Sequence, residues 1–269
     1  MTILAGYAVP HPPLIIPAVG RGEQLKIQAT IDSYEQVARE MAELAPDALI
    51  ISSPHAPLFR DGFHIADDAH FEGSMARFRA PRERVEADGD VELARAIATA
   101  AEEAGIPAGP YGGRGLELDH ASYIPLWFIG RECTPPPVVL MGLSGLDAET
   151  HFELGRIVAA QAAALGRRVV WIASGDLSHK LKADGPYGLS EEGPVFDEQI
   201  CDIFATGELE RLADFTDDFA YKAAACGLRS CERMAGALED CDFGSELLSH
   251  EGTFGVGYGV AAFRVKGES

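Results

Sequence analysis

Four short apolar runs, separated by stretches with helical periodicity, constrain the fold of this chain most strongly. The runs cover residues 3–9, 48–52, 138–143 and 169–173. Continuous apolar runs of this length are typical of parallel strands that are buried on both faces. Their alternation with helices predicts an α/β fold, in which a single domain over residues 1–269 has three α/β/α layers and a mainly parallel central sheet.

The segments between and after these strands complete the predicted architecture. Helices are predicted over residues 23–45, 91–104 and 148–165, and closing strands over residues 246–248 and 255–265. Asp90 is placed to cap the second of these helices. Residues 60–86 show no clear periodicity, and we interpret them as an excursion at the mouth of the functional site.

Charge and composition exclude several classes of partner. The chain has 42 acidic and 22 basic residues, which gives a net charge of −20. This charge opposes phosphate backbones and anionic lipid, so we expect neither a nucleic acid nor a membrane as partner. With no apolar run of the ~20 residues that a membrane span needs and no signal-peptide pattern, a cytoplasmic location is predicted. Five cysteines without a C-x-x-C pair argue against a disulfide framework or a zinc ribbon.

Three histidines, His11, His55 and His179, each follow a predicted strand. His11 and His55 lie in Pro-His-x-Pro turns, whose prolines restrict the backbone. The carboxyl ends of parallel strands meet at one edge of a sheet, so the three imidazoles are expected to converge there. A convergent histidine cluster indicates a metal site. The alternative for each residue alone is a histidine that caps a strand end through a backbone hydrogen bond.

Two further motifs place acidic residues beside histidines. Asp176 precedes His179 by three positions, so a helical turn would bring both side chains to one space. There His179 suits general acid–base catalysis, with Asp176 orienting it or binding substrate; alternatively, Asp176 caps a short helix. His120 follows Asp119, and it is either a contact for a metal-bound ligand or a capped histidine at the start of an apolar helix. The remaining histidines are expected to be surface or structural residues: His64, His70, His151 and His250.

Taken together, the motifs resemble the class III extradiol ring-cleavage dioxygenase superfamily. Its members include the catalytic subunit of protocatechuate 4,5-dioxygenase, the Memo proteins and AmmeMemoRadiSam system protein B. The resemblance runs along almost the whole chain. It rests on the two Pro-His turns, Leu-Asp-His at 118–120, Ser-Gly-Asp-Leu-Ser-His at 174–179, Cys-Gly-Leu-Arg-Ser at 226–230 and Glu-Gly-Thr-Phe-Gly-Val-Gly-Tyr at 251–258.

The resemblance implies a role for each candidate residue. In such dioxygenases two histidines and a glutamate hold Fe(II), and His11 and His55 match the two histidines. His179 resembles the histidine that accepts and returns a catechol proton, and His120 resembles the one near bound oxygen and substrate. The expected glutamate is absent from this chain. Cys226 stands there instead, as in Memo-type proteins, while Glu251 or water are the other candidates for third ligand.

Three functions follow from these expectations. The first is a non-haem extradiol dioxygenase that uses Fe(II) and O₂ to cleave a small aromatic diol. The second is a Memo-like protein that binds copper or zinc without ring cleavage, because a Cys226 thiolate would favour these softer ions. A zinc hydrolase with a metal-bound water is the third. The resemblance also implies a homodimer.

Overall fold

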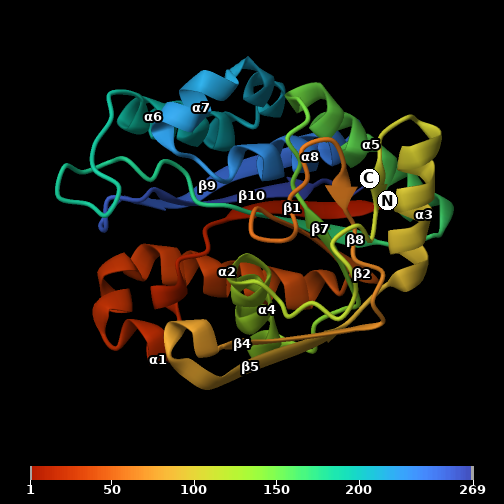
Figure 1. Cartoon of the computed structure of the whole chain (residues 1–269), viewed down its shortest axis with the longest axis horizontal. Helices are drawn as coiled ribbons and strands as arrows, with labels where there is room; N and C mark the ends of the chain where they lie inside the picture. The colour runs from red at the N-terminus through yellow and green to blue at the C-terminus, as the bar shows by residue number, and fades with distance from the viewer. Residues whose placement is uncertain (1, 268–269) are drawn as a thin grey trace.

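The computed structural model describes residues 2–267, in which a six-stranded sheet lies between two layers of helices (Figure 1). The strands run in the order β7 (Val138–Gly142), β2 (Ala48–Ser53), β8 (Val169–Ser174), β1 (Ile3–Val9), β10 (Tyr258–Val265) and β9 (Phe243–Glu251). The first four strands are parallel to one another, and β10 and β9 are antiparallel additions. The predicted α/β fold with a mainly parallel sheet is confirmed.

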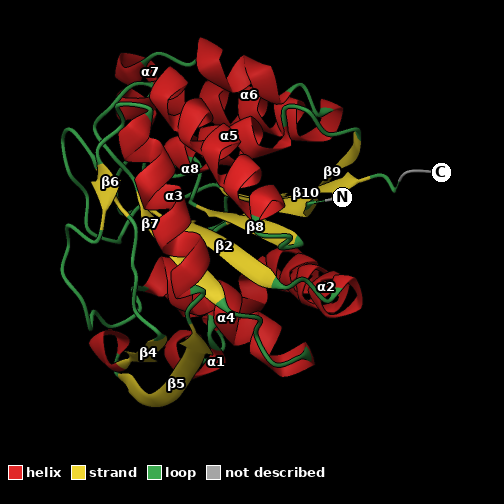
Figure 2. Ribbon diagram, turned by 90° about the vertical axis from the view of Figure 1, so that its right-hand side faces the viewer, coloured by secondary structure: helices red, strands yellow, loops and turns green. Residues whose placement is uncertain are grey.

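Helices cover both faces of the sheet (Figure 2). One face carries α1 (Pro17–Gly20), α2 (Gln28–Leu44) and α4 (His120–Glu132); the other carries α3 (Val91–Glu103), α5 (Ala148–Ala164), α6 (Glu192–Thr206), α7 (Asp217–Ala223) and α8 (Leu228–Leu238). Successive strand side chains point to opposite faces. In β2, for example, Ile50 packs in the core beneath α3 and α5, whereas Ile51 packs in the core beneath α2 and α4. Both core layers therefore contain side chains of the same apolar strands.

Local signals explain where the helices begin. Asp90 caps α3, because its carboxylate accepts a hydrogen bond from the Leu93 amide at 3.0 Å. The helix expected from residue 23 starts instead as a 3-10 helix, Glu23–Ile27, before α2. Other short elements are the 3-10 helices Pro13–Ile15, Ala76–Phe78 and Leu209–Asp214 and the paired strands β3 (Phe63–His64) and β6 (Ala108–Gly109). Within residues 2–267, no helix is both long and apolar enough to cross a membrane.

Residues 60–86, for which the sequence indicated no regular structure, contain most of a β-hairpin. Its strands are β4 (His70–Met75) and β5 (Ala80–Asp88), paired antiparallel. Phe71, Gly73 and Met75 are buried and alternate with more exposed residues, which is the period of a strand with one covered face. Charged neighbours obscured this alternation in the sequence. The turn between the strands carries Phe78 to the candidate site.

The packing of α5 against α8 depends on a glycine. A Cβ atom on Gly155 would lie 2.0 Å from the Arg233 carbonyl oxygen. We expect Gly155→Ala to lower the free energy of unfolding by about 1–3 kcal/mol, because the helices must move apart. Gly130→Ala in α4 is the matched control: its nearest neighbour would be 4.0 Å away, so it should stabilise by about 0.5–1 kcal/mol. Urea denaturation measures both; equal effects would contradict the close packing.

Candidate metal centre

His11 is fixed by three contacts just beyond the end of β1. The Tyr34 hydroxyl donates to the Pro10 carbonyl, which holds the proline turn. The His11 amide donates to Asp176 Oδ1 at 2.7 Å, and the ring Nδ1 lies 3.1 Å from Ser174 Oγ at the end of β8. His11 is buried, with 2% of its surface exposed. Its other ring nitrogen, Nε2, is therefore held toward the cavity.

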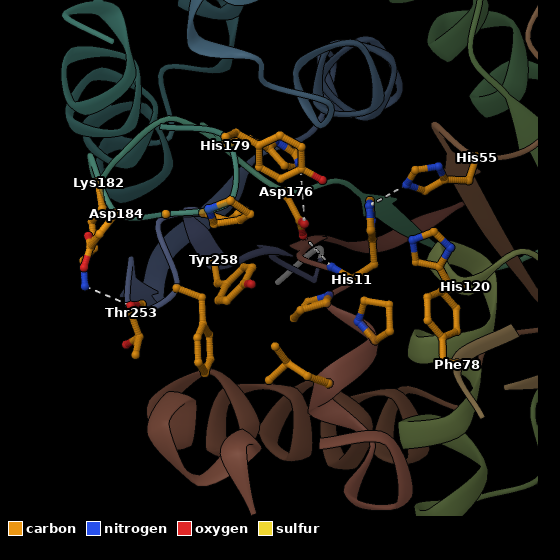
Figure 3. Close-up of a pocket in the computed structure, with 18 residues that line it drawn as sticks. His11, His55, Phe78, His120, Asp176, His179, Lys182, Asp184, Thr253 and Tyr258 are labelled. Carbon is orange, nitrogen blue, oxygen red and sulfur yellow. Dashed lines mark hydrogen bonds and ion pairs between the residues drawn. The ribbon is translucent and has the colours of Figure 1, made fainter. Parts of the chain in front are cut away.

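His55 and His120 complete a cluster of three imidazoles around this nitrogen (Figure 3). His55 Nε2 lies 3.1 Å from His11 Nε2, and the His55 and His120 rings are 4.1 Å apart between centroids. One ligand atom from each of the three residues lies within 4.8 Å of the other two. This convergence comes from the ends of β1 and β2 and the start of α4.

A hydrogen bond between two elements explains why His120 reaches His55. Asp119 caps α4 by accepting from the amides of Ala121 at 2.8 Å and Ser122 at 3.1 Å. The same carboxylate accepts from Ser53 Oγ, at the end of β2, at 2.7 Å. The cap of α4 is thus tied to the strand that leads to His55, so the first residue of the helix lies beside that ring.

The cluster has the donor chemistry that a metal ion requires. Two nitrogens that each bind one ion at ~2.1 Å lie no more than ~4.2 Å apart, and the 3.1 Å between His11 Nε2 and His55 Nε2 is within this limit. Burial lowers the pKa of all three imidazoles, and that of His120 to about 4. At neutral pH the rings are therefore uncharged, with lone pairs free to coordinate. Imidazole nitrogens suit zinc, copper and iron.

The lowered pKa of His120 gives a testable pH dependence. The unfolded chain takes up this proton near pH 6.5, whereas the folded metal-free protein resists it until about pH 4. His120 therefore contributes a loss of stability as the pH falls from about 6.5 to about 4, and no further loss below. Long-range ¹H–¹⁵N NMR should show the ring unprotonated at pH 5.5. A midpoint near pH 6.5 would contradict the burial of the cluster.

Asp176 and His179 lie on the opposite side of His11 from the other two imidazoles (Figure 3). Asp176 Oδ2 is 3.8 Å from His179 Nε2. His179 Nδ1 lies 2.6 Å from the Ala224 carbonyl oxygen, which can only accept, so Nδ1 carries the proton of the neutral ring. In this tautomer His179 Nε2 has a free lone pair, and it lies next to a carboxylate whose pKa is raised by burial.

The helical turn that the sequence suggested between Asp176 and His179 is wrong, and so is the helix cap. The segment after β8 has no helix, because it pairs with the chain before β10. The Leu177 amide donates to the Gly257 carbonyl at 2.9 Å, and the Gly257 amide donates to Ser178 at 2.7 Å. These tertiary bonds hold the segment extended and still bring the two side chains together.

Of the two side chains that the sequence suggested as third ligand, Cys226 lies beside His11 and Glu251 does not. Cys226 is next to His11: its sulfur accepts from the Asp176 amide at 3.2 Å and lies 3.7 Å from His11 Nε2. Burial raises the pKa of this thiol well above its usual range. Glu251 instead accepts from the amide and hydroxyl of Thr30 at 2.8 and 2.6 Å, which joins β9 to α2. Its carboxylate does not line the cavity.

The five candidate residues His11, His55, His120, Asp176 and His179 line one open cavity of about 740 Å³. Cys226 does not line it, although its sulfur lies 3.7 Å from His11 Nε2. The structure adds residues that sequence reasoning missed: Phe78, Lys182 and Tyr258. Only Tyr258 lay within a recognised motif. The Phe78 ring is 5.3 Å from His120, and Lys182 donates to the Thr253 carbonyl at 2.8 Å, across the rim.

Several known proteins are similar to this chain in sequence or in fold. A family model described as the catalytic LigB subunit of aromatic ring-opening dioxygenase matches residues 5–261. Protein CA_C1420 of Clostridium acetobutylicum is 37% identical over 267 residues, which cover 97% of this chain but 57% of that protein. This chain thus spans little more than half the length of that relative.

More distant relatives have printed activities. The 3,4-dihydroxyphenylacetate 2,3-dioxygenase of Escherichia coli is 22% identical, covering 72% of this chain and 74% of that protein. The 2-aminophenol 1,6-dioxygenase β subunit of a Pseudomonas species is 23% identical, covering 98% and 94%. The crystal structure of uncharacterized protein JW3007 from Escherichia coli K12 superimposes with a TM-score of 0.62 at 16% identity, covering 96% and 99% of the two chains, and so shares the fold. Since the family model matches nearly the whole chain, this protein belongs to the LigB family of aromatic ring-opening dioxygenase subunits.

Proposed function

We propose that this protein is a metal-dependent dioxygenase that opens the ring of a catechol-type compound with O₂. The observation that carries the proposal is the placement of a three-imidazole cluster and the base His179 around one cavity. Fe(II) is the ion that this reaction calls for. His11 and His55 are the two ligands we propose, and His120 and Cys226 compete for the third position.

Each residue around the cavity has a separate role in the proposed reaction. A bound metal ion supplies positions at which a diol and O₂ are activated. His179 accepts a substrate hydroxyl proton at Nε2, because its Nδ1 proton is held by Ala224. Asp176 stabilises the imidazolium that results. The hydrogen bond that Asp176 accepts from the His11 amide holds His179 and the histidine cluster in a fixed relative position. His120, when it is not a ligand, contacts the bound substrate or oxygen.

The size and lining of the cavity support an aromatic substrate. A volume of about 740 Å³ accommodates a single substituted aromatic ring. Phe78 and Tyr258 provide flat apolar walls, and Lys182 stands at the rim. The named substrates of the two distant relatives are a catechol with an acidic side chain and an aminophenol, which support a small ring with two adjacent donor groups.

A second function is favoured by one specific observation. Within residues 2–267, no carboxylate belongs to the histidine cluster, and the Cys226 sulfur lies 3.7 Å from His11 Nε2. A cysteine ligand would make the site softer and better suited to copper or zinc than to oxygen-activating iron. In this alternative the protein is a Memo-like metal-binding protein without ring cleavage.

Electron paramagnetic resonance of the anaerobic Fe(II) protein with nitric oxide distinguishes the two functions. A high-spin iron–nitrosyl signal that shifts on addition of catechol, together with a yellow ring-opened product in air, would support the dioxygenase. Absence of an iron signal from protein that still binds copper or zinc would favour the Memo-like alternative.

The third ligand is open to a direct spectroscopic test. If Cys226 binds, the Co(II) protein has a thiolate-to-cobalt charge-transfer band that Cys226→Ala removes while His120→Ala leaves it. If His120 binds, His120→Ala weakens Co(II) binding, and Cys226→Ala changes neither the spectrum nor the affinity. Cys231→Ala, a buried thiol in α8, is the matched control and should leave both unchanged.

A further inference from the structure

A second cavity adjoins the metal centre behind the rings of His55 and His120. Its volume is about 450 Å³, within the range of small-molecule sites. His55, Phe78 and His120 line both cavities, so the two spaces share a wall. The second cavity also reaches apolar side chains of the hairpin and sheet, among them Phe71 and Leu140. None of the proposed chemistry uses this space.

A buried histidine in the wall presents an unused hydrogen-bond donor. His64 is 3% exposed, and its Nδ1 accepts from the Gly112 amide at 3.1 Å. A backbone amide can only donate, so Nδ1 has no proton and the neutral ring carries its proton on Nε2. Within residues 2–267, the Gly112 contact is the only hydrogen bond of the His64 ring. The Nε2–H group thus lacks a protein acceptor, and the side chain lines the cavity.

Glycines hold His64 in this orientation. A Cβ on Gly112 would lie 2.4 Å from Pro57 and 3.1 Å from His64 Nδ1, so only glycine lets this backbone approach the ring. A Cβ on Gly142 would lie 2.3 Å from the Pro57 carbonyl oxygen and 3.3 Å from His64 Cβ. The donor is therefore rigidly placed. The expectation that His64 is a surface or structural residue overlooked this donor.

Two charged side chains of the cavity already have hydrogen-bond partners, and two others have none among the described residues. Asp119 is engaged by the amides of α4 and by Ser53, and Asp68 accepts from the Gly115 amide at 2.9 Å. Glu117 and Arg77 are exposed and, among the described residues, form no ion pair. In the part of the chain that the structure describes, Arg77 is the only arginine or lysine that lines the cavity. The fixed neutral donor of His64 and the guanidinium of Arg77 can both bind an acceptor oxygen.

We propose that the second cavity binds a small molecule with one carboxylate group, which accepts a hydrogen bond from His64 Nε2–H and pairs with Arg77. The apolar walls take the rest of the molecule, of about the size of one aromatic ring. The site is separate from the metal centre and requires no ring cleavage. A molecule bound there contacts the rings of His55 and His120 and therefore restrains the metal-binding rings.

Calorimetric titration of the full chain with benzoate, phenylacetate and 3-phenylpropionate tests the proposal. We expect at least one of them to bind, with and without zinc in the protein. Arg77→Gln should weaken that binding about tenfold or more, as for loss of a charge-assisted hydrogen bond. Arg79→Gln is the matched control on the same turn; Arg79 does not line the cavity, so affinity should be unchanged.

His64 is tested by two variants, since removal of a buried ring can impair folding. His64→Leu removes the donor and should weaken binding, while His64→Gln keeps a donor near the Nε2 position and should restore part of it. The proposal is overturned if none of the three carboxylates binds, if zinc is required for binding, or if Arg77→Gln has no effect. Binding of phenylacetamide as tight as that of phenylacetate would refute the pairing with Arg77. All these readouts are independent of turnover, so failure of the dioxygenase assignment would leave them interpretable.

Discussion

His11→Ala is expected to abolish specific metal binding. His11 is the most deeply buried member of the cluster, and its Nε2 faces both His55 and the Cys226 sulfur. It therefore contributes to the site whichever residue is the third ligand. Mutation of a residue that only hydrogen-bonds to a metal ligand typically lowers metal affinity 10- to 100-fold. Removal of the ligand His11 itself should therefore lower the affinity by more than about a hundredfold. Competition titration with Zn(II) and a chromophoric chelator measures the change.

The control for this prediction is His70→Ala. His70 is exposed in β4, contacts Asp88 at the surface and does not line the cavity of the cluster. The affinity of this variant should equal that of the wild type, and circular dichroism should show both variants folded. A folded His11→Ala protein that binds zinc as tightly as the wild type would contradict the assignment of the metal centre to this cluster.

The sheet could be predicted from sequence because its strands are buried on both faces. Runs such as Ala-Leu-Ile-Ile in β2 are apolar without interruption, so no knowledge of their neighbours is needed to recognise them. The hairpin of β4 and β5 was missed because only one face is covered. There the alternation of Phe71, Gly73 and Met75 with more exposed polar residues is short, so the sequence shows no clear period.

The candidate site was predictable to the extent that strand ends determine it. His11, His55 and His179 follow β1, β2 and β8, which are parallel, and the structure brings all three to one cavity. The position of His120 relative to the two other rings depends on the Ser53–Asp119 bond, which joins residues 66 positions apart. A single sequence contains no signal for such a pairing.

The conformation around Asp176 shows a second limit. Three-residue spacing suggests a helical turn, but local spacing competes with long-range backbone pairing, and here the bonds to Gly257 determine the backbone. The buried position of His64 depends in the same way on the approach of Gly112 from a distant loop. In both places the tertiary contacts, not the local pattern, decide what the side chain faces.

His179→Ala is expected to lower kcat/KM for ring opening by about 10²- to 10⁴-fold, the usual range for a general acid–base. His179 does not belong to the three-imidazole cluster, so metal affinity should change little. His179→Gln also removes the base and should not restore activity. Asp176→Asn is the informative companion, because an asparagine oxygen can still accept from the His11 amide while the negative charge beside His179 is lost.

The metal content and the unfolding transition separate a catalytic His179 from a merely structural one. In His179→Ala both should match those of the wild type although turnover is lost. Asp176→Asn should also lower turnover, because the imidazolium then lacks its stabilising charge. Unchanged turnover in a folded, metal-loaded His179→Ala protein would show that another group takes the substrate proton. Tyr258 is the next residue to test, because it lines the same cavity.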